Sequence, residues 1–428
     1  MPKALNQLTA CEASVLIHEK KIRSQDLVKA CLARVAERDN VVHAWAGISP
    51  EMAIAQAHAR DGEASRGPLH GIPIAIKDVI DTCDLPTEMG SPIFAGHQPR
   101  IDAAVVAQLR SAGAVILGKT VTAEFAGMAP TITANPHNLA HTPGGSSSGS
   151  AAAVADAMVP IAFGTQTGGS VLRPASYCGV FGYKPTFGRI NRAGLKFAAE
   201  SIDTLGWMAR SLEDIALVDG VLSAGSTDPL EARRPFRIGL CRTFMWDKAL
   251  PETKEAIANA DAKLQQAGII VEAVELPADF TALTRFRQNI NDYERVHGLA
   301  HEWAHHRAQI SPELSASLRR GDALAESDYI AALKFSEHAR VRLDQWMQPY
   351  DVLITPCVNG EAPKGLAFAG DPSFQALWTL LHVPVVCLPT HRGPKGLPVS
   401  IQLVGRRYGD TRLLQNALAI WTILKPSP

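Results

Sequence analysis

Residues 144–174 read GGSSSGSAAAVADAMVPIAFGTQTGGSVLRP, and this stretch indicates more about the fold than any other. Two glycine- and serine-rich turns enclose a short helix of small residues, predicted over 151–158, and a buried strand, predicted over 159–163. Glycine lets the backbone approach a ligand and adopt conformations that a β-carbon would forbid. Backbone N–H groups in such turns form a donor site for negative charge, and the serines add hydroxyls beside it. An acyl-transfer enzyme requires these groups.

Strand and helix patterns alternate on both sides of this stretch. The apolar runs 72–76 and 114–117 read as buried strands with a helix between them. A polar segment rich in proline and arginine, 225–236, is a candidate linker. Beyond it, residues 237–274 form a strand–helix–strand unit. This alternation predicts an α/β fold, with a sheet that helices cover on both faces.

The overall charge favours neither nucleic acid nor an anionic membrane as a partner. The 428 residues contain 42 Lys and Arg against 42 Asp and Glu, so the formal net charge is zero. Binding through bulk charge needs a basic excess that this chain lacks. No apolar run reaches the roughly 20 residues that a membrane span requires. We therefore expect a small-molecule substrate, no nucleic acid and no membrane.

The cysteines and the N-terminus favour a cytoplasmic location. Seven cysteines are scattered along the chain, an odd number without a CxxC pair. Such a distribution of cysteines is typical of a protein in a reducing compartment and not of one that disulfide bonds hold together. The N-terminus shows no basic stretch followed by an apolar run, so we expect no signal peptide.

The second turn supplies a candidate nucleophile and an oxyanion site. Ser170 follows Thr167, Gly168 and Gly169, whose N–H groups can converge on one oxygen. A serine hydroxyl is a poor nucleophile until a base takes its proton. No histidine lies close to Ser170 in the sequence, so the base must come from another segment.

Lys77 is the candidate base. It ends an apolar run, and burial at the end of a strand lowers the pKa of an amine toward neutrality. Ser146, in the first turn, can relay the proton from Ser170 to this lysine, a variant of the hydrolase triad. The alternative is that the turns are ordinary loops and that Lys77 forms an ion pair with Asp78 or Asp81.

The stretch 144–179, with Lys77 upstream, resembles the signature of the amidase signature family. That signature consists of a Gly-Gly-Ser-Ser turn, a helix of small residues and a Gly-Thr/Ser-Asp-Thr-Gly-Gly-Ser turn. The similarity continues through 184–186, and 201–206 resembles a second segment of the family. The resemblance implies Lys77 as the base, Ser146 as the bridging serine after a cis peptide bond, and Ser170 as the acyl-bearing nucleophile.

The resemblance also implies an architecture, a large twisted mixed β-sheet covered by helices on both faces, for one domain spanning 1–428. Its parts are a helical N-terminal segment (1–65), the signature core (66–224), and a second part of the same sheet (237–428) with a helical insertion (281–347). Neither a metal nor a cofactor is expected. Relatives in this family are often dimers, so a homodimer is expected as well.

Two departures from the broad family pattern concern the substrate. Gln166 stands where the family has aspartate, and the usual arginine is shifted by one place to Arg173. The malonamidases of bacteria share both features, and further segments of the chain resemble them. The resemblance implies that Arg173 holds a substrate carboxylate in a bidentate pair and that Gln166 also contacts the substrate, a small malonamate-like amide. The alternative is that Arg173 neutralises a structural carboxylate.

Other functions remain open at this stage. The chain could be the glutaminase subunit of a tRNA-dependent amidotransferase, although that type of subunit carries aspartate at the position of Gln166 and runs longer at its C-terminus. The sequence HEWAH at 301–305 matches a zinc-peptidase pattern, with His301 and His305 as ligands and Glu326 as a third. A binding protein that has lost its activity is a further alternative, which the intact Lys77, Ser146 and Ser170 disfavour.

Overall fold

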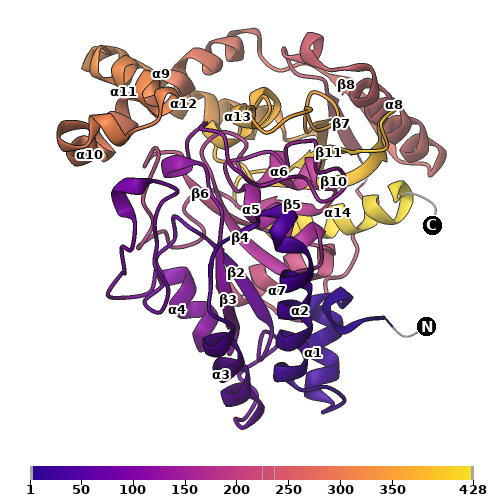
Figure 1. Ribbon diagram of the computed structural model, residues 1–428. Helices are drawn as coiled ribbons and strands as arrows, with labels where there is room; N and C mark the ends of the chain where they lie inside the picture. The colour runs from indigo at the N-terminus through magenta and orange to yellow at the C-terminus, as the bar shows by residue number, and fades with distance from the viewer. Residues whose placement is uncertain (1–2, 224, 236, 426–428) are drawn as a thin grey trace.

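The computed structural model describes residues 3–223, 225–235 and 237–425. One mixed sheet of eleven strands runs through these residues, in the order β1-β3-β2-β4-β6-β5-β10-β11-β9-β7-β8 (Figure 1). The strands are β1 (Trp45–Ile48), β2 (Pro73–Lys77), β3 (Val115–Thr120), β4 (Ile161–Gln166), β5 (Phe181–Lys184), β6 (Thr204–Ala209), β7 (Arg237–Cys241), β8 (Ile270–Val274), β9 (Val352–Pro356), β10 (Val385–Arg392) and β11 (Pro398–Val404).

Strand direction is mixed within this sheet. β2 lies between β3 and β4 and runs parallel to both, and β7 runs parallel to β8 and β9. The remaining neighbours are antiparallel. Every residue of β2, β3 and β4 is buried, as expected for parallel strands covered on both faces, whereas the edge strands β1 and β8 are partly exposed.

Helices cover both faces of the sheet, which confirms the predicted α/β architecture (Figure 1). α5 packs on β2, β3 and β4 and contacts α6, whereas α7 packs on β5 and β6 and contacts α1, α4 and α14. The helices are α1 (Ala10–His18), α2 (Ser24–Val42), α3 (Pro50–Asp61), α4 (Ala104–Ser111), α5 (Ser148–Ala155), α6 (Leu172–Tyr177), α7 (Leu212–Leu222), α8 (Pro251–Gln266), α9 (Leu283–Gly298), α10 (Ala300–His305), α11 (Pro312–Asp322), α12 (Glu326–Trp346), α13 (Ser373–Leu380) and α14 (Asp410–Leu424).

The predicted segments differ from the observed ones in places. The N-terminal segment is mostly helical, but its strand β1 pairs with β3 and so belongs to the sheet. The helical insertion comprises α9 to α12, which gather at one corner of the molecule (Figure 1). The candidate linker has no helix or strand over 225–235, and its last residue, 236, lies outside the described residues.

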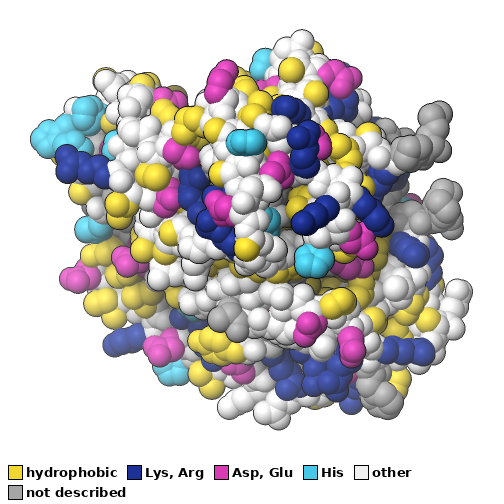
Figure 2. Space-filling model, turned by 90° about the horizontal axis from the view of Figure 1, so that it is seen from below, with side chains coloured by type: hydrophobic (Ala, Val, Ile, Leu, Met, Phe, Trp, Pro, Cys, Tyr) yellow, Lys and Arg dark blue, Asp and Glu magenta, His cyan; other side chains and the backbone are white. Residues whose placement is uncertain are grey.

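Strand pairing joins the parts of the chain before and after this segment. β5 pairs antiparallel with β10, with Val385 opposite Lys184 and Cys387 opposite Gly182. The core is therefore continuous across the sheet. Within the described residues, no helix is both long and apolar enough to cross a bilayer. Basic and acidic side chains intermingle over the face drawn in Figure 2, in line with the zero net charge.

Candidate active site

The end of β2 places Lys77 inside the molecule. The strand is apolar apart from this residue, so the sheet carries the ammonium group into the core, where the side chain is fully buried. Lys77 Nζ donates to Ser146 Oγ at 2.8 Å and to Thr165 Oγ1 at 2.9 Å. Thr165 lies on β4, the neighbouring strand, and the sequence analysis did not identify it. The expected alternative, an ion pair with Asp78 or Asp81, does not form among the described residues.

Burial determines the protonation of this lysine. Loss of water is the main cause that lowers the pKa of the Lys77 ammonium; Asp203 opposes it and Arg295 adds to it, and together they bring the pKa to about 7. Both direct partners are neutral hydroxyls, so neither stabilises the charged form as a carboxylate would. A neutral amine at this position can accept a proton near neutral pH.

The first turn holds Ser146 against Lys77. Gly144 adopts a φ of 83°, the left-handed region that favours glycine, and the peptide bond between Gly145 and Ser146 is cis, as the family resemblance implies. α5 then begins at Ser148 and packs on β2, β3 and β4. The turn is thereby fixed between the sheet and a buried helix.

The second turn joins the end of β4 to the start of α6 and carries Ser170. The Ser147 N–H donates to the Ser170 carbonyl at 3.3 Å, which ties the two turns together. Ser170 is 7% exposed and lines a cavity of about 310 Å³. Its Oγ makes no hydrogen bond to any described residue, so the hydroxyl is free to meet a ligand.

The loop before Ser170 leaves donors free. Within the described part of the chain, the N–H groups of Gly168 and Gly169 have no acceptor, and both residues line the same cavity. The Gly168 carbonyl is held from behind by Thr379 Oγ1 at 2.7 Å, and Thr167 Oγ1 donates to Asp203. The loop is thus anchored by the Thr167 side chain and the Gly168 carbonyl, and the N–H groups of its two glycines remain without an acceptor among the described residues.

Gln166 was expected to contact the substrate, but its side chain is bonded to other parts of the protein. Its Oε1 accepts from the N–H groups of Val171 and Leu172 at 2.9 and 3.0 Å, and its Nε2 donates to Thr379 Oγ1 at 2.9 Å. The side chain is fully buried. Both polar ends are therefore used in closing the turn around Ser170, and this role depends on α13, which no local sequence pattern predicts.

Arg173 lines the cavity but is also held by the backbone. Its Nε and Nη2 donate to the Gly145 carbonyl at 3.2 and 2.5 Å, and its Nη1 donates to the Gly370 carbonyl at 2.6 Å. Burial lowers its pKa to about 10, so the guanidinium stays charged at neutral pH. Among the described residues, no carboxylate lies within 4.0 Å of the guanidinium, although the charge of Asp371 acts on it from farther away.

The sequence analysis missed the contribution of α9. Arg287, Asn291 and Arg295 line the same cavity as Ser170, and their spacing of four residues places them on one face of the helix. The spacing of these polar residues is visible in the sequence, but the direction in which this face of the helix points depends on how α9 packs.

The zinc-peptidase pattern lies on α10 and does not line the cavity of Ser170. The rings of His301 and His305 are 4.9 Å apart and both side chains are exposed. Glu302, which would act as the general base, is buried and forms an ion pair with Lys196 at 2.7 Å. Across the described ranges, no group of three residues is arranged to hold a metal ion. This geometry does not support the peptidase alternative.

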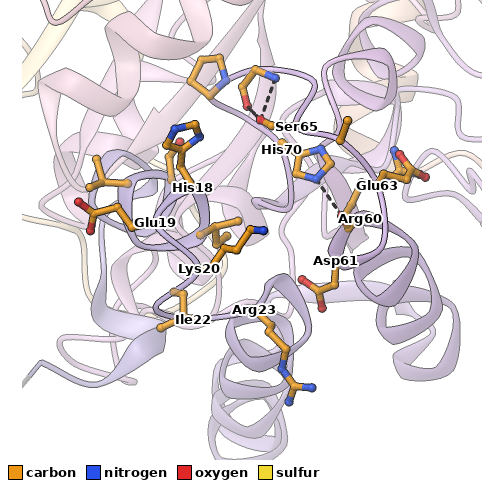
Figure 3. A pocket seen from close by; sticks show the side chains of 16 residues that line it. His18, Glu19, Lys20, Ile22, Arg23, Arg60, Asp61, Glu63, Ser65 and His70 are labelled. Carbon is orange, nitrogen blue, oxygen red and sulfur yellow. Dashed lines mark hydrogen bonds and ion pairs between the residues drawn. The ribbon is translucent and has the colours of Figure 1, made fainter.

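A wider cavity of about 880 Å³ lies between the N-terminal helices and the loop that precedes β2 (Figure 3). Its polar groups are largely satisfied by nearby backbone: His70 Nε2 is 2.9 Å from the Arg60 carbonyl, and Ser65 Oγ contacts the backbone of Gly67. Asp61 accepts from the N–H groups at the start of α2. None of the predicted site residues lies there.

Comparison with known proteins covers nearly the whole chain. The sequence pattern of the Amidase family matches residues 26–414. The glutamyl-tRNA(Gln) amidotransferase A-type subunit of Moorella thermoacetica is 34% identical over 470 aligned positions, covering 97% of this chain and 96% of that protein.

Two solved structures show the same fold. A chain from a vestigial protein complex, reported to reveal the evolutionary origins of an s-triazine catabolic enzyme, superimposes with a TM-score of 0.90 at 27% identity, covering 98% of this chain and all of that one. A crystal structure of an amidase superimposes with a TM-score of 0.88 at 28% identity, covering 97% of this chain and 99% of that one.

Proposed function

This chain belongs to the amidase family, whose members act on amide C–N bonds, and from that premise we propose that Ser170 is its nucleophile, Ser146 its proton relay and Lys77 its base. One observation carries the proposal. Among the described residues, a buried lysine with a pKa of about 7 makes hydrogen bonds only to hydroxyls. One of these hydroxyls belongs to a turn that is hydrogen-bonded to the turn of Ser170.

The proposed reaction follows from these positions. Neutral Lys77 takes the proton of Ser146 Oγ, which takes that of Ser170 Oγ as this oxygen bonds to the amide carbon. The N–H groups of Gly168 and Gly169 stabilise the oxyanion. The C–N bond then breaks, and the leaving nitrogen receives the proton back through the relay. Water attacks the acyl-enzyme and releases the acid, which regenerates Ser170.

For the substrate, we propose a small amide that carries a carboxylate. The cavity is small, and its described lining includes four arginines (Arg173, Arg287, Arg295 and Arg320) and the acid Glu313. Arg320 forms an ion pair with Asp292, which leaves three arginines without an ion pair among the described residues. An excess of positive charge in a partly enclosed cavity favours an anionic ligand. A malonamate-like molecule, as the resemblance to malonamidases implies, fits this description, with Arg173 as one anchor.

The second candidate is a glutaminase subunit of an amidotransferase. The relatives from Moorella thermoacetica and Chloroflexus aggregans, both 34% identical, carry the name of a glutamyl-tRNA(Gln) amidotransferase subunit, so the names of relatives favour this candidate over a malonamate-like substrate. The match covers 96% of the former over 470 aligned positions, more than the 428 residues of this chain, so the extra length of that subunit lies mostly within the aligned range and not beyond its C-terminus. Glutamine also carries a carboxylate beside its amide, but its ammonium group needs an acceptor, and Glu313 is the one acid lining the cavity.

Ammonia release from a panel of amides separates these candidates. The purified chain is assayed with malonamate, succinamate, glutamine, acetamide and benzamide. Malonamate or succinamate as the best substrate supports the first candidate, and glutamine as the best substrate supports the second. Ser170→Ala should abolish release in either case, and Ser65→Ala, in the N-terminal cavity, should not change it. Full activity of Ser170→Ala would refute the proposed mechanism.

A further inference from the structure

Two arginines from different helices approach the same part of the active-site cavity. Arg173 lies on α6, three residues beyond Ser170, and Arg287 lies on α9. Arg287 Nη1 is 3.7 Å from the point where a β-carbon on Gly168 would lie, so its guanidinium sits over the oxyanion loop. The charge of Arg287 lowers the pKa of Arg173, which is the expected effect of two cations close together.

Neither guanidinium has an acid of its own. Among the described residues, no carboxylate oxygen lies within 4.0 Å of a nitrogen of either guanidinium, so neither arginine forms an ion pair. The nearby acids are already engaged: Asp371 with Lys248 at 3.2 Å, and Asp292 with Arg320 at 2.7 Å. Arg287 makes one hydrogen bond within the described ranges, to Gln288 Oε1 at 3.2 Å.

Such an arrangement is unfavourable without an anion. Desolvation lowers the pKa of both Arg173 and Arg287, although both remain charged at neutral pH. Arg173 is fully buried and Arg287 is partly buried. Cations withdrawn from water are usually paired, because the loss of hydration costs free energy that a partner restores. Arg189 shows the usual solution in this molecule, with two of its nitrogens on Asp219.

Space is available beside Arg287. Gly168 has no side chain, so the guanidinium and the free N–H groups of the loop face the same cavity. Farther along the same face of α9, Arg295 is 5% exposed, and its Nε has no hydrogen-bond partner. The positive stripe of α9 therefore continues past Arg287 along the cavity.

We propose that Arg287 binds the carboxylate of the substrate together with Arg173, and that this pair selects short anionic amides over neutral ones. The proposal rests on the proposed function, because it assigns the substrate class to the same nucleophile. Arg287 is then a specificity-determining residue on a helix outside the signature stretch. The carboxylate would occupy the space between the two guanidinium groups, with the amide carbon at Ser170 Oγ.

The test compares malonamate with malonamide, which replaces the carboxylate by a neutral group of nearly the same shape. Arg287→Gln should raise KM for malonamate about 10- to 100-fold, the usual range for losing a hydrogen bond to a charged group, and should leave kcat and the KM for malonamide nearly unchanged. Arg285→Gln, an exposed arginine on the same helix, is the matched control and should change neither value. An equal rise in KM for malonamate and malonamide would overturn the proposal.

A binding measurement keeps the test independent of turnover. Malonate should bind the Ser170→Ala protein, and adding Arg287→Gln should weaken that binding by the same factor. Failure of malonate to bind, or binding that Arg287→Gln leaves unchanged, overturns the proposal. Thermal unfolding guards against a folding defect: an arginine without an ion pair should leave the Tm of Arg287→Gln equal or higher. If that variant unfolds, Arg287→Lys should show a smaller rise in KM for malonamate alone.

These outcomes separate the inference from the proposed function. If Ser170→Ala retains full activity, the proposed function fails whatever Arg287 does. If Ser170→Ala is inactive and Arg287→Gln affects both amides equally, the serine mechanism stands and the inference about Arg287 fails.

Discussion

Two buried lysines on neighbouring strands show how differently the same side chain can be used. Lys77 ends β2 and Lys119 lies on β3, where it stands opposite Ile76. Because successive residues of a strand point to opposite faces, the two side chains leave the sheet on opposite sides. Both are essentially inaccessible to solvent, and burial lowers the pKa of each.

The difference lies in their partners. Lys119 Nζ forms an ion pair with Asp78 Oδ1 at 3.2 Å and donates to Thr87 Oγ1 at 2.5 Å, and the carboxylate offsets the effect of burial. Within the described part of the chain, Lys77 Nζ makes hydrogen bonds only to the hydroxyls of Ser146 and Thr165. Burial alone therefore does not make a base, because a lysine can lose its proton readily only where no acid holds the charge.

Replacing the lysine without an acid should have the largest effect on activity. Lys77→Met removes the proposed base, and the loss of a general base typically lowers kcat about 10²- to 10⁴-fold. The Tm of this variant should remain close to that of the parent protein, because an amine without an ion pair adds little stability. Ammonia release above a tenth of the parent rate would contradict the assignment.

Replacing the paired lysine should instead affect stability. Lys119→Met leaves the buried Asp78 without its ionic partner, which typically costs about 3–5 kcal/mol of unfolding free energy. Urea denaturation measures this cost. The double variant Asp78→Asn/Lys119→Met should recover most of it. A stability loss for Lys119→Met no greater than that for Lys77→Met would remove the distinction between the two lysines.

The pH profile should report the unpaired lysine. The neutral amine is the active form, so kcat/KM should fall about tenfold per pH unit below the Lys77 pKa of about 7 and level off above it. The pKa of Asp78 is raised by burial to about 6, so the double variant at positions 78 and 119 serves as the control. A profile that changes in this control would assign the titration to Asp78.

A third buried lysine should show the smallest effect. Lys184 also has a pKa lowered by burial to about 7, yet its Nζ donates only to the Pro185 carbonyl at 2.8 Å. No serine hydroxyl bonds to it among the described residues. Lys184→Met should therefore leave kcat within about twofold, because most substitutions outside a site act on stability alone. A large loss of kcat in a folded variant would give Lys184 a role that its contacts do not indicate.

The sequence could predict the parts of the site that lie within one segment. The apolar run before Lys77 predicts a buried strand, and the glycine–serine turns predict the positions of Ser146 and Ser170. Thr165 could not be found in this way, because its contact with Lys77 depends on the pairing of β2 with β4.

Parts that depend on packing between distant segments were missed or misassigned. Gln166 was expected to contact the substrate, but α13 brings Thr379 to its amide and so fixes it within the protein. Arg287 follows Ser170 by more than a hundred residues, and nothing local shows that α9 turns it toward the nucleophile. The short strand β1 escaped the prediction because four residues give little periodicity.

The pairing of β5 with β10 has a consequence for how the enzyme could be divided. Lys77, Ser146 and Ser170 all precede the exposed segment 226–234, whereas Arg287 and Thr379 follow it. A protease that nicks this segment would cut the chain between these two groups without opening the sheet that holds them. Two separately expressed fragments should thus reassemble into one working catalyst, with the nucleophile on one fragment and the charge-recognition helix on the other.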